Sequence, residues 1–306
     1  MRVKSETIAG RHTATVMVLL LVVAAAPAVH ANLFSTVMLG GGHEDNLSRG
    51  FASSDQHGSA YSTLQLRGGK LFQPGLNTSL TVSGSFGHSR YFSQKGFDSN
   101  VLGTAVSLEH KFGLGPYTPR IALALSADRE DLEGAERDRS LYNLGLSLSK
   151  RFSPAWSGSV GVVSETSRGN SERHTDLSAY YSTAQPHDIF DYDNDVASAS
   201  IEYSFENGNL LTASYSRSDG YVVSSAVPPV SHLISNASAL AADPAFEHRR
   251  VLYLLKAETD NFSAGLNIPL GRDTSLDMQM NWYSIHGKGT GNYRNARAGV
   301  SLIHRF

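Results

Sequence analysis

The sequence predicts an all-β chain that closes as a transmembrane, antiparallel, up-and-down β-barrel of about 12 strands. Three observations predict this fold. Apolar and small polar residues alternate with a period of two through most of the chain, which is typical of strands with two different faces. Short turns and longer polar loops follow one another in strict alternation. The body of the chain has no apolar run of the roughly 18 residues that a membrane helix needs.

The composition excludes several function classes. The chain has 306 residues, no cysteine and a formal net charge of −2. Without cysteine there is neither a disulfide nor a thiolate-bound metal. A nearly neutral chain offers no basic surface for nucleic acid, so we expect no nucleic-acid partner. No phosphate-binding loop or zinc signature occurs in the sequence, and we expect no cofactor.

The N-terminus predicts export from the cytoplasm. Basic residues near the start precede an apolar core from Val16 to Ala26. Short side chains at Val29 and Ala31 fit the cleavage rule of a secretory signal peptide, and the core is too short to span a membrane. We therefore expect a signal peptide at residues 1–31 and one barrel domain at residues 32–306.

The first four strands are expected at residues 33–42, 57–72, 78–91 and 100–112. The third has the clearest pattern, because Leu80, Val82 and Phe86 alternate with serine and threonine. This polar face is small and mostly uncharged, which suits a crowded interior better than the solvent face of a soluble sandwich. The turns at 73–77 and 113–117 combine glycine with proline, the residues that reverse a chain tightly.

Of the next four strands, the first is expected at residues 118–129, and the second is expected to end at Phe152. The other two are expected at 156–166 and 195–205. Leu144, Leu146 and Leu148 alternate with Gly145 and serine in the sixth strand. A short turn follows at 153–155, whereas long polar loops are expected at 130–137 and 167–194. This spacing continues the hairpin pattern of the first four strands.

Of the last four strands, the first is expected to end at Tyr221 and the second to span 250–270. The third is expected to include Leu276–Tyr283, and the fourth to span 293–306. The loop at 222–249 is expected to hold a short helix near 232–242. The first half of the tenth strand carries Lys256, Glu258 and Asp260, so we expect it to project beyond the bilayer.

The final strand ends the chain on Phe306, after apolar or small residues at Leu302, Val300 and Ala298. This pattern resembles the C-terminal assembly signal of bacterial outer-membrane β-barrel proteins, although His304 stands where that family usually has an aromatic or aliphatic residue. The resemblance implies an outer-membrane location, contact with lipid and lipopolysaccharide, and the barrel-assembly machinery as a partner.

An outer-membrane location predicts on which side of the membrane the turns lie and where the aromatic residues gather. Short turns are expected at the periplasm and long loops outside the cell. A closed ring is required, because an open strand edge in hydrocarbon leaves backbone groups without partners. We expect two aromatic girdles, formed by Phe72, Phe112, Phe152, Trp156, Phe205 and Phe306 at one end and by Tyr91, Tyr215, Trp282 and Tyr293 at the other.

A weaker similarity concerns residues 38–47, which resemble the first strand of barrel domains attached to periplasmic helical-repeat proteins. Those proteins export surface lipoproteins or polysaccharides. The sequence has no helical-repeat segment before the barrel, so such a role implies a separate periplasmic partner.

Histidines beside carboxylates and serines raise catalytic and metal-binding alternatives. Candidate cation ligands are expected in the loops at 43–45, at Asp55 with His57, and at 187–195, but solvated loops facing lipopolysaccharide are the favoured interpretation. A hydrolase at the barrel rim requires a histidine that activates a serine, as in the pairs His88–Ser89 and His286–Ser284. Serine is so abundant that such pairs arise by chance, and we expect no catalytic or metal-binding residue.

Charged residues on the polar face of the strands are the candidate functional residues. They are Arg67, Glu109, Lys111, Asp128, Arg151, Glu165, Glu202, Asp277, Arg297 and Arg305. They either line a polar path or form ion pairs that fill the barrel, since a barrel of about 12 strands lies between filled and open ones. The sequence favours a narrow pore for small polar solutes. The alternatives are a secretion or surface-assembly barrel and a rim-sited hydrolase.

Overall fold

The computed structural model describes residues 31–133, 137–169, 188–227, 231–243, 245–246 and 250–306; nearly all of the predicted signal peptide lies outside them. The strands are β1 (Ala31–Glu44), β2 (Ser59–Gly75), β3 (Thr78–Tyr91), β4 (Ser99–Lys111), β5 (Arg120–Leu132), β6 (Arg139–Arg151), β7 (Trp156–Gly169), β8 (Tyr192–Ser204), β9 (Leu210–Ala226), β10 (Ala237–Asp243), β11 (Arg250–Pro269), β12 (Thr274–Gly287) and β13 (Gly291–Arg305). Short helices lie at η1 (Ser53–Asp55), η2 (Lys95–Phe97) and α3 (Ser231–Ile234). None of the helices in these described residues is long and apolar enough to cross a membrane.

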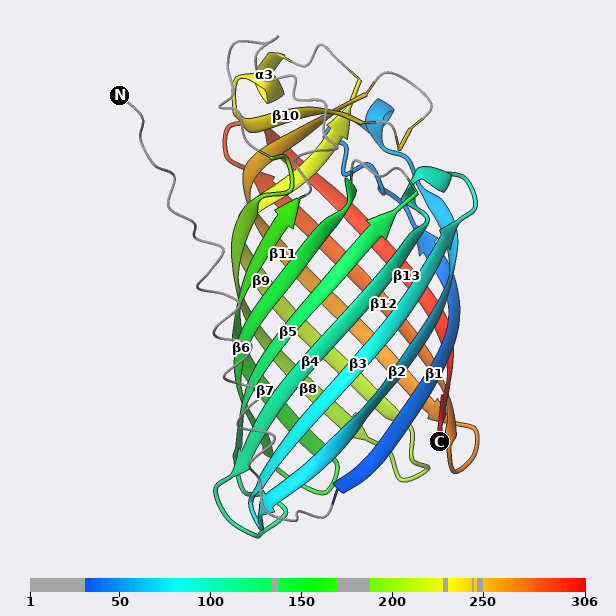
Figure 1. Ribbon diagram of the computed structural model, residues 1–306, viewed down its shortest axis with the longest axis vertical. Coiled ribbons are helices and arrows are strands. Elements are labelled where there is room, and N and C mark those ends of the chain that lie inside the picture. Colours follow the sequence, from blue (N-terminus) through cyan, green and yellow to red (C-terminus); the bar gives the residue numbers. More distant parts are fainter. Residues whose placement is uncertain (1–30, 134–136, 170–187, 228–230, 244, 247–249) are drawn as a thin grey trace, which may run out of the picture.

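The long strands close into a ring, which confirms the predicted antiparallel up-and-down barrel (Figure 1). Consecutive strands pair from β1 to β9 and from β11 to β13, β1 pairs with β13, and β11 pairs with β9 as well as β12. Twelve strands form this ring, and β10 is an additional strand paired with β11. Closure gives the backbone of every wall strand a partner on both sides, as hydrocarbon requires.

The outer surface of the ring is apolar. Leu66 on β2, Phe86 on β3 and Leu102 on β4 are register neighbours, and all three side chains are exposed. In a soluble protein such a row would be buried, whereas in a barrel it contacts lipid. Residues at the alternate positions therefore point into the ring.

Aromatic side chains mark both ends of this apolar surface, with one correction to the expected girdles. Trp156 packs on Tyr203 at the short-turn end (ring centroids 4.7 Å apart), and Tyr215 packs on Phe262 at the other (4.9 Å). Tyr91 and Tyr293 were wrongly predicted as girdle residues, because both are buried on the inward face of their strands and pack in the core clusters described below.

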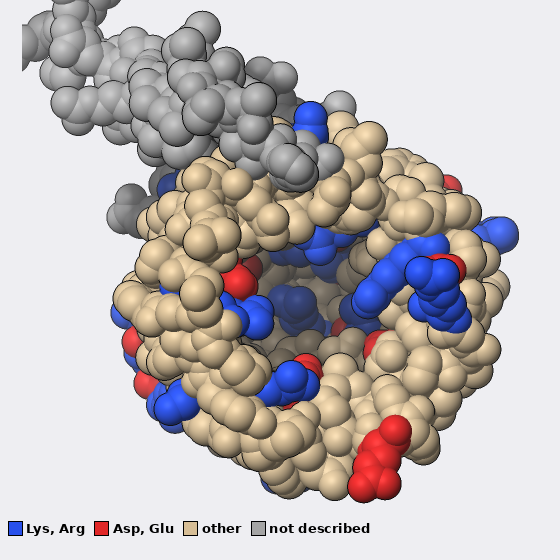
Figure 2. Space-filling view, turned by 90° about the horizontal axis from the view of Figure 1, so that it is seen from below, with Lys and Arg blue, Asp and Glu red and all other residues tan. Residues whose placement is uncertain are grey.

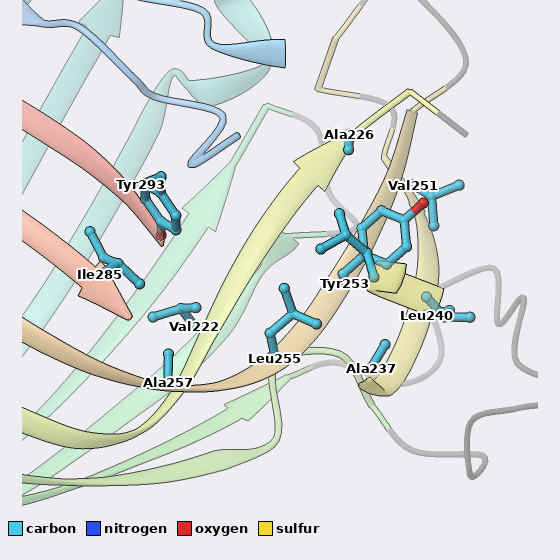
Figure 3. Packing of buried hydrophobic residues seen from close by; sticks show 11 residues of the cluster. Val222, Ala226, Ala237, Leu240, Val251, Tyr253, Leu255, Ala257, Ile285 and Tyr293 are labelled. Carbon is cyan, nitrogen blue, oxygen red and sulfur yellow. The ribbon is translucent and has the colours of Figure 1, made fainter. Parts of the chain in front are cut away.

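The unexpected element is a cap over the long-loop end of the ring, in the region expected to be a loop. There β9 continues to Ala226 and β11 begins at Arg250, and β10 pairs with the opposite edge of β11. Val251, Tyr253 and Leu255 pack in one buried cluster (Figure 3), and alternate residues of β11 pack in a second. This sheet is therefore buried on both faces.

The helix expected at 232–242 is only partly correct. The helix α3 ends at Ile234, and the following alanine-rich segment forms β10 because pairing with β11 satisfies its backbone. The predicted bounds of β3 match the structure, whereas β1, β9 and β12 extend further toward the long-loop end than expected.

Candidate functional site: the polar lumen

The inward face of the ring carries small polar side chains. On β9 they are Thr212, Ser214, Ser216 and Ser218, which alternate with the outward Leu211 and Ala213. Ser214 shares a hydrogen bond of 2.9 Å with Ser263 of β11. Small hydroxyl groups leave space in the interior and present donors and acceptors to it.

All ten charged residues singled out from the sequence occupy inward strand positions. Two of them, Glu165 and Arg297, line a cavity of about 490 Å³ at the long-loop end, here called the upper cavity. Three others, Lys111, Arg151 and Glu202, line a cavity of about 660 Å³ at the short-turn end, here called the lower cavity.

Four of the remaining five have side-chain neighbours on the same face, and Arg305 lies exposed at the end of β13. Glu109 pairs with Arg120 at 3.5 Å, a partner that the sequence reading had not singled out. Arg67 donates to the hydroxyl of Ser83 (3.3 Å). Asp128 accepts from Ser126, Asp277 accepts from Asn267, and the Arg305 backbone N–H donates to Asp273. The pairing of these residues depends on strand register, which alternation along one strand does not reveal.

Cations and carboxylates alternate around the upper cavity. Arg139 forms an ion pair with Glu130 (Nε–Oε2 2.7 Å) and donates to the hydroxyl of Tyr192 (2.9 Å). Arg297 donates to the Tyr61 hydroxyl (3.0 Å), and its guanidinium lies 4.4 Å from the centre of that ring. Held this way, the cations are fixed against the wall rather than free in the lumen.

Arg49 projects into the upper cavity from the loop between β1 and β2. Its backbone has a φ of 53°, and its side chain is accessible from the cavity although protein surrounds it on the inside of the ring. Among the described residues, the guanidinium has no hydrogen bond or ion pair. Burial lowers its pKa, but the nearby phenols of Tyr293 and Tyr192 and the carboxylate of Glu44 raise it, and the pKa is raised overall. No sequence pattern singled out this residue, because its conformation depends on contacts with distant strands.

These contacts fasten the loop under the cap. Ser224 on β9 donates its hydroxyl to the Arg49 carbonyl (2.7 Å), and the Ser225 N–H donates to the Ser48 carbonyl (2.9 Å). Arg250 on β11 donates to the carbonyl of Asp55 (3.0 Å) and to that of Ser225 (2.6 Å). The loop and the cap therefore form one unit at the long-loop end.

The opposite end of the ring is open. Viewed from the short-turn end, the molecule is hollow, and Lys and Arg side chains lie around and inside the opening (Figure 2). The lower cavity in this region is lined by Lys111 from β4, Arg120 from β5 and Arg151 from β6, together with serine and threonine hydroxyl groups.

The architecture matches solved channels of the outer membrane. The COG4313 outer membrane channel from Pseudomonas putida F1 aligns with a TM-score of 0.56 at 12% sequence identity, over 92% of this chain and 98% of that chain. The NanC porin gives a TM-score of 0.47 at 7% identity, over 88% of this chain and 98% of that one. The KdgM porin gives 0.44 at 9% identity, over 88% and 99%. No protein-family model and no curated protein sequence matches the chain.

The fold shared with the Pseudomonas putida channel agrees with the apolar outer surface and its aromatic borders. The chain has the fold of a bacterial outer-membrane β-barrel. In barrels of this fold short turns face the periplasm and long loops the exterior, so we expect the cap to face outward. His304, the departure from the assembly signal, lies on the outer face, shares a hydrogen bond of 2.9 Å with Thr274 and packs edge-on against Phe306 (ring centroids 4.5 Å apart). Its imidazole therefore occupies the aromatic position of the signal.

The glycine run in residues 38–47 of this outer-membrane barrel has a packing explanation. A Cβ at Gly42 would collide with the carbonyl of Ala298 and the hydroxyl of Tyr61, and one at Gly40 would collide with Ser301. Leu47 belongs to a buried cluster under the cap. Close approach of strands and loop packing account for this pattern without a helical-repeat partner.

The two histidine–serine pairs do not form a nucleophile–base arrangement in the barrel wall. His88 and Ser89 are adjacent on one strand and point to opposite faces. Ser284 and Asp260 both approach the same nitrogen of His286, Nε2, at 3.3 and 3.5 Å. A catalytic relay needs the serine and the orienting carboxylate on different ring nitrogens.

Three loop carboxylates considered as cation ligands each contact a different group of the protein. Glu44 accepts from Asn295 (2.9 Å), Asp45 accepts from the Ala296 N–H (2.7 Å), and Asp55 pairs with Arg250 (3.7 Å). In the described residues no group of three or more His, Asp or Glu side chains is placed to hold a metal ion. His187 lies outside those residues.

Proposed function

We propose that the barrel is a narrow pore for small polar solutes. The observation that carries this proposal is the hollow polar interior, with the lower cavity at the periplasmic end and the upper cavity beneath the cap. A structural barrel stabilised by its interior would fill this volume with large side chains.

The lining favours polar solutes, which lose part of their hydration when they leave bulk water. Hydroxyl groups of Ser214, Ser263 and Ser159 replace part of the hydration of a sugar or a small organic molecule. Mixed charges along the wall, such as the pair of Arg139 and Glu130, hold further water. An apolar solute gains nothing from such a lining.

The cap limits the size of the solute. The loop that carries Arg49 and the buried sheet of β9, β10 and β11 occupy the outer part of the ring, so the free cross-section is narrowest there. We expect monosaccharide-sized molecules to pass and large oligomers to be excluded.

Swelling of liposomes containing the purified barrel tests this function. In solutions of sugars of increasing size, swelling is expected to be fast for pentoses and to fall steeply for disaccharides and trisaccharides. The variant Ser214→Trp fills the lumen, whereas Ala213→Trp places the same ring on the lipid face one position away. Ser214→Trp should slow the swelling and Ala213→Trp should not. Swelling no faster than in protein-free liposomes with every sugar would refute the pore.

A further inference from the structure

Three cations meet on adjacent strands at the periplasmic end of the lumen. Lys111 on β4 lies directly opposite Arg120 on β5. Arg120 is in turn opposite Ser149 on β6, so Arg151 lies diagonally beside it on the same inward face. Like charges directly opposite each other destabilise a sheet, and here Arg151 adds a third cation on the next strand.

Protein carboxylates neutralise this group only in part. Arg120 has an ion pair with Glu109 at 3.5 Å, and Glu202 accepts from the hydroxyl of Ser157 (3.2 Å). Among the described residues neither Lys111 nor Arg151 has an ion pair; Lys111 reaches only the carbonyl of Leu114, at 3.5 Å. The charged side chains at inward positions of the lower cavity are Lys111, Arg120 and Arg151 against Glu202 alone; Lys150, which also borders the cavity, has the outward parity of Leu146 and Leu148.

Hydroxyl groups complete the lining of the lower cavity. Ser159 and Ser200 share a hydrogen bond of 2.8 Å across β7 and β8, and Ser149 lies beside the cations. Hydroxyl donors together with guanidinium groups are the groups that bind carboxylates, because arginine can hold both carboxylate oxygens at once. The site faces the periplasm through an open mouth, where low-dielectric walls concentrate the field of the cations.

Building on the proposed pore, we propose that the lower cavity is an anion-binding site that selects small organic polycarboxylates. Its volume of about 660 Å³ lies within the range of small-molecule sites and exceeds what one inorganic anion fills. Several separated cations match several carboxylate groups on one solute. The site concentrates such solutes at the periplasmic end of the pore.

Citrate is a suitable probe in planar bilayers that contain the complete barrel. Added to the periplasmic side, citrate should block the potassium chloride current, and added to the other side it should block less. The double variant Lys111→Gln/Arg151→Gln removes two charge-assisted contacts and should weaken the block by about tenfold or more. The control Lys70→Gln removes an outward-facing lysine of β2 near the same end and should leave the block unchanged.

A second readout separates this site from the pore itself. Calorimetric titration of citrate into detergent-solubilised barrel should give binding in the wild type and in Lys70→Gln, and at least tenfold weaker binding in the double variant. If the wild type conducts no current but binds citrate in this way, the pore proposal is wrong and the anion-site proposal stands.

Two results would overturn the anion site while leaving the pore intact. One is an equal block of wild type and double variant by citrate in a conducting barrel. The other is a block by inorganic phosphate as strong as that by citrate, which would remove the selection for polycarboxylates. The single variant Arg151→Gln, with an intermediate loss expected, replaces the double variant if that protein does not fold.

Discussion

Arg137 and Asp243, 106 residues apart in the sequence, form a two-pronged ion pair with Nε–Oδ1 and Nη2–Oδ2 distances of 3.1 and 2.7 Å. The side chain of Asp243 is completely buried. The same carboxylate accepts the hydroxyl of Ser225 on β9. Because Asp243 ends β10 and Arg137 precedes β6, this pair fastens the cap to the rim of the barrel beside β6.

Replacing Asp243 with alanine should release the cap. Loss of one partner from a buried ion pair costs about 3–5 kcal/mol, since it leaves a buried charge without compensation. We expect trypsin to cut the cap of Asp243→Ala far faster than that of the wild type, with the barrel wall intact. The control Asp131→Ala removes an exposed partner of Arg129, a surface pair worth about 0–1 kcal/mol. Equal cleavage of the two variants would contradict this role of Asp243.

Two substitutions at Arg49 separate backbone strain from charge. A φ of 53° is unfavourable for residues with a side chain but not for glycine, so Arg49→Gly should be more stable than Arg49→Ala by about 1 kcal/mol. Both remove the guanidinium from the upper cavity and should raise single-channel conductance to the same extent. Urea unfolding in detergent and bilayer recording measure the two effects. Equal stabilities would disprove the strain, and unchanged conductance would place Arg49 outside the solute path.

Adjacent valines of β7 test the assignment of the two faces. The side chain of Val162 is 56% exposed on the outer surface near the middle of the strand, and Val163 points into the lumen. Val162→Arg should lower the free energy of unfolding in lipid vesicles by about 2–4 kcal/mol. Val163→Arg should destabilise the barrel less and reduce its conductance. If Val163→Arg destabilised the barrel more than Val162→Arg, the assignment of the two faces would be wrong.

Deletion of Phe306 tests the proposed contact with the barrel-assembly machinery. In cells the shortened chain should accumulate unassembled, because the aromatic end of the resembling signal is missing. Purified from urea, it should still fold in detergent micelles, since Phe306 is 75% exposed and contributes little to internal packing. Normal assembly in cells would show that this chain does not use the terminal aromatic residue.

The barrel wall could be predicted from sequence because alternate residues of each strand face two different environments, lipid and lumen. Leu80, Val82 and Phe86 set the face of β3, and the bounds of that strand match the structure. The inward position of charges such as Glu165 follows from the same alternation. Local pattern is sufficient where lipid and lumen are the only two surroundings.

The cap could not be predicted in this way. Its centre, from Val251 to Leu255, is apolar at consecutive positions because both faces are buried, so the alternation disappears. The ion pair of Arg137 with Asp243 and the pairing of Arg120 with Glu109 depend on contacts between separate segments. The run at 251–255 was the available signal, since a short continuous apolar run is consistent with a fully buried strand.

The proposed function requires that the polar lumen be a path across the outer membrane. Recording of single channels from purified wild-type barrel in planar bilayers tests it most directly. We expect discrete, small conductance steps that increase in Asp243→Ala, where the cap is released. Electrically silent bilayers, with folded wild-type and Asp243→Ala barrels both inserted, would contradict it.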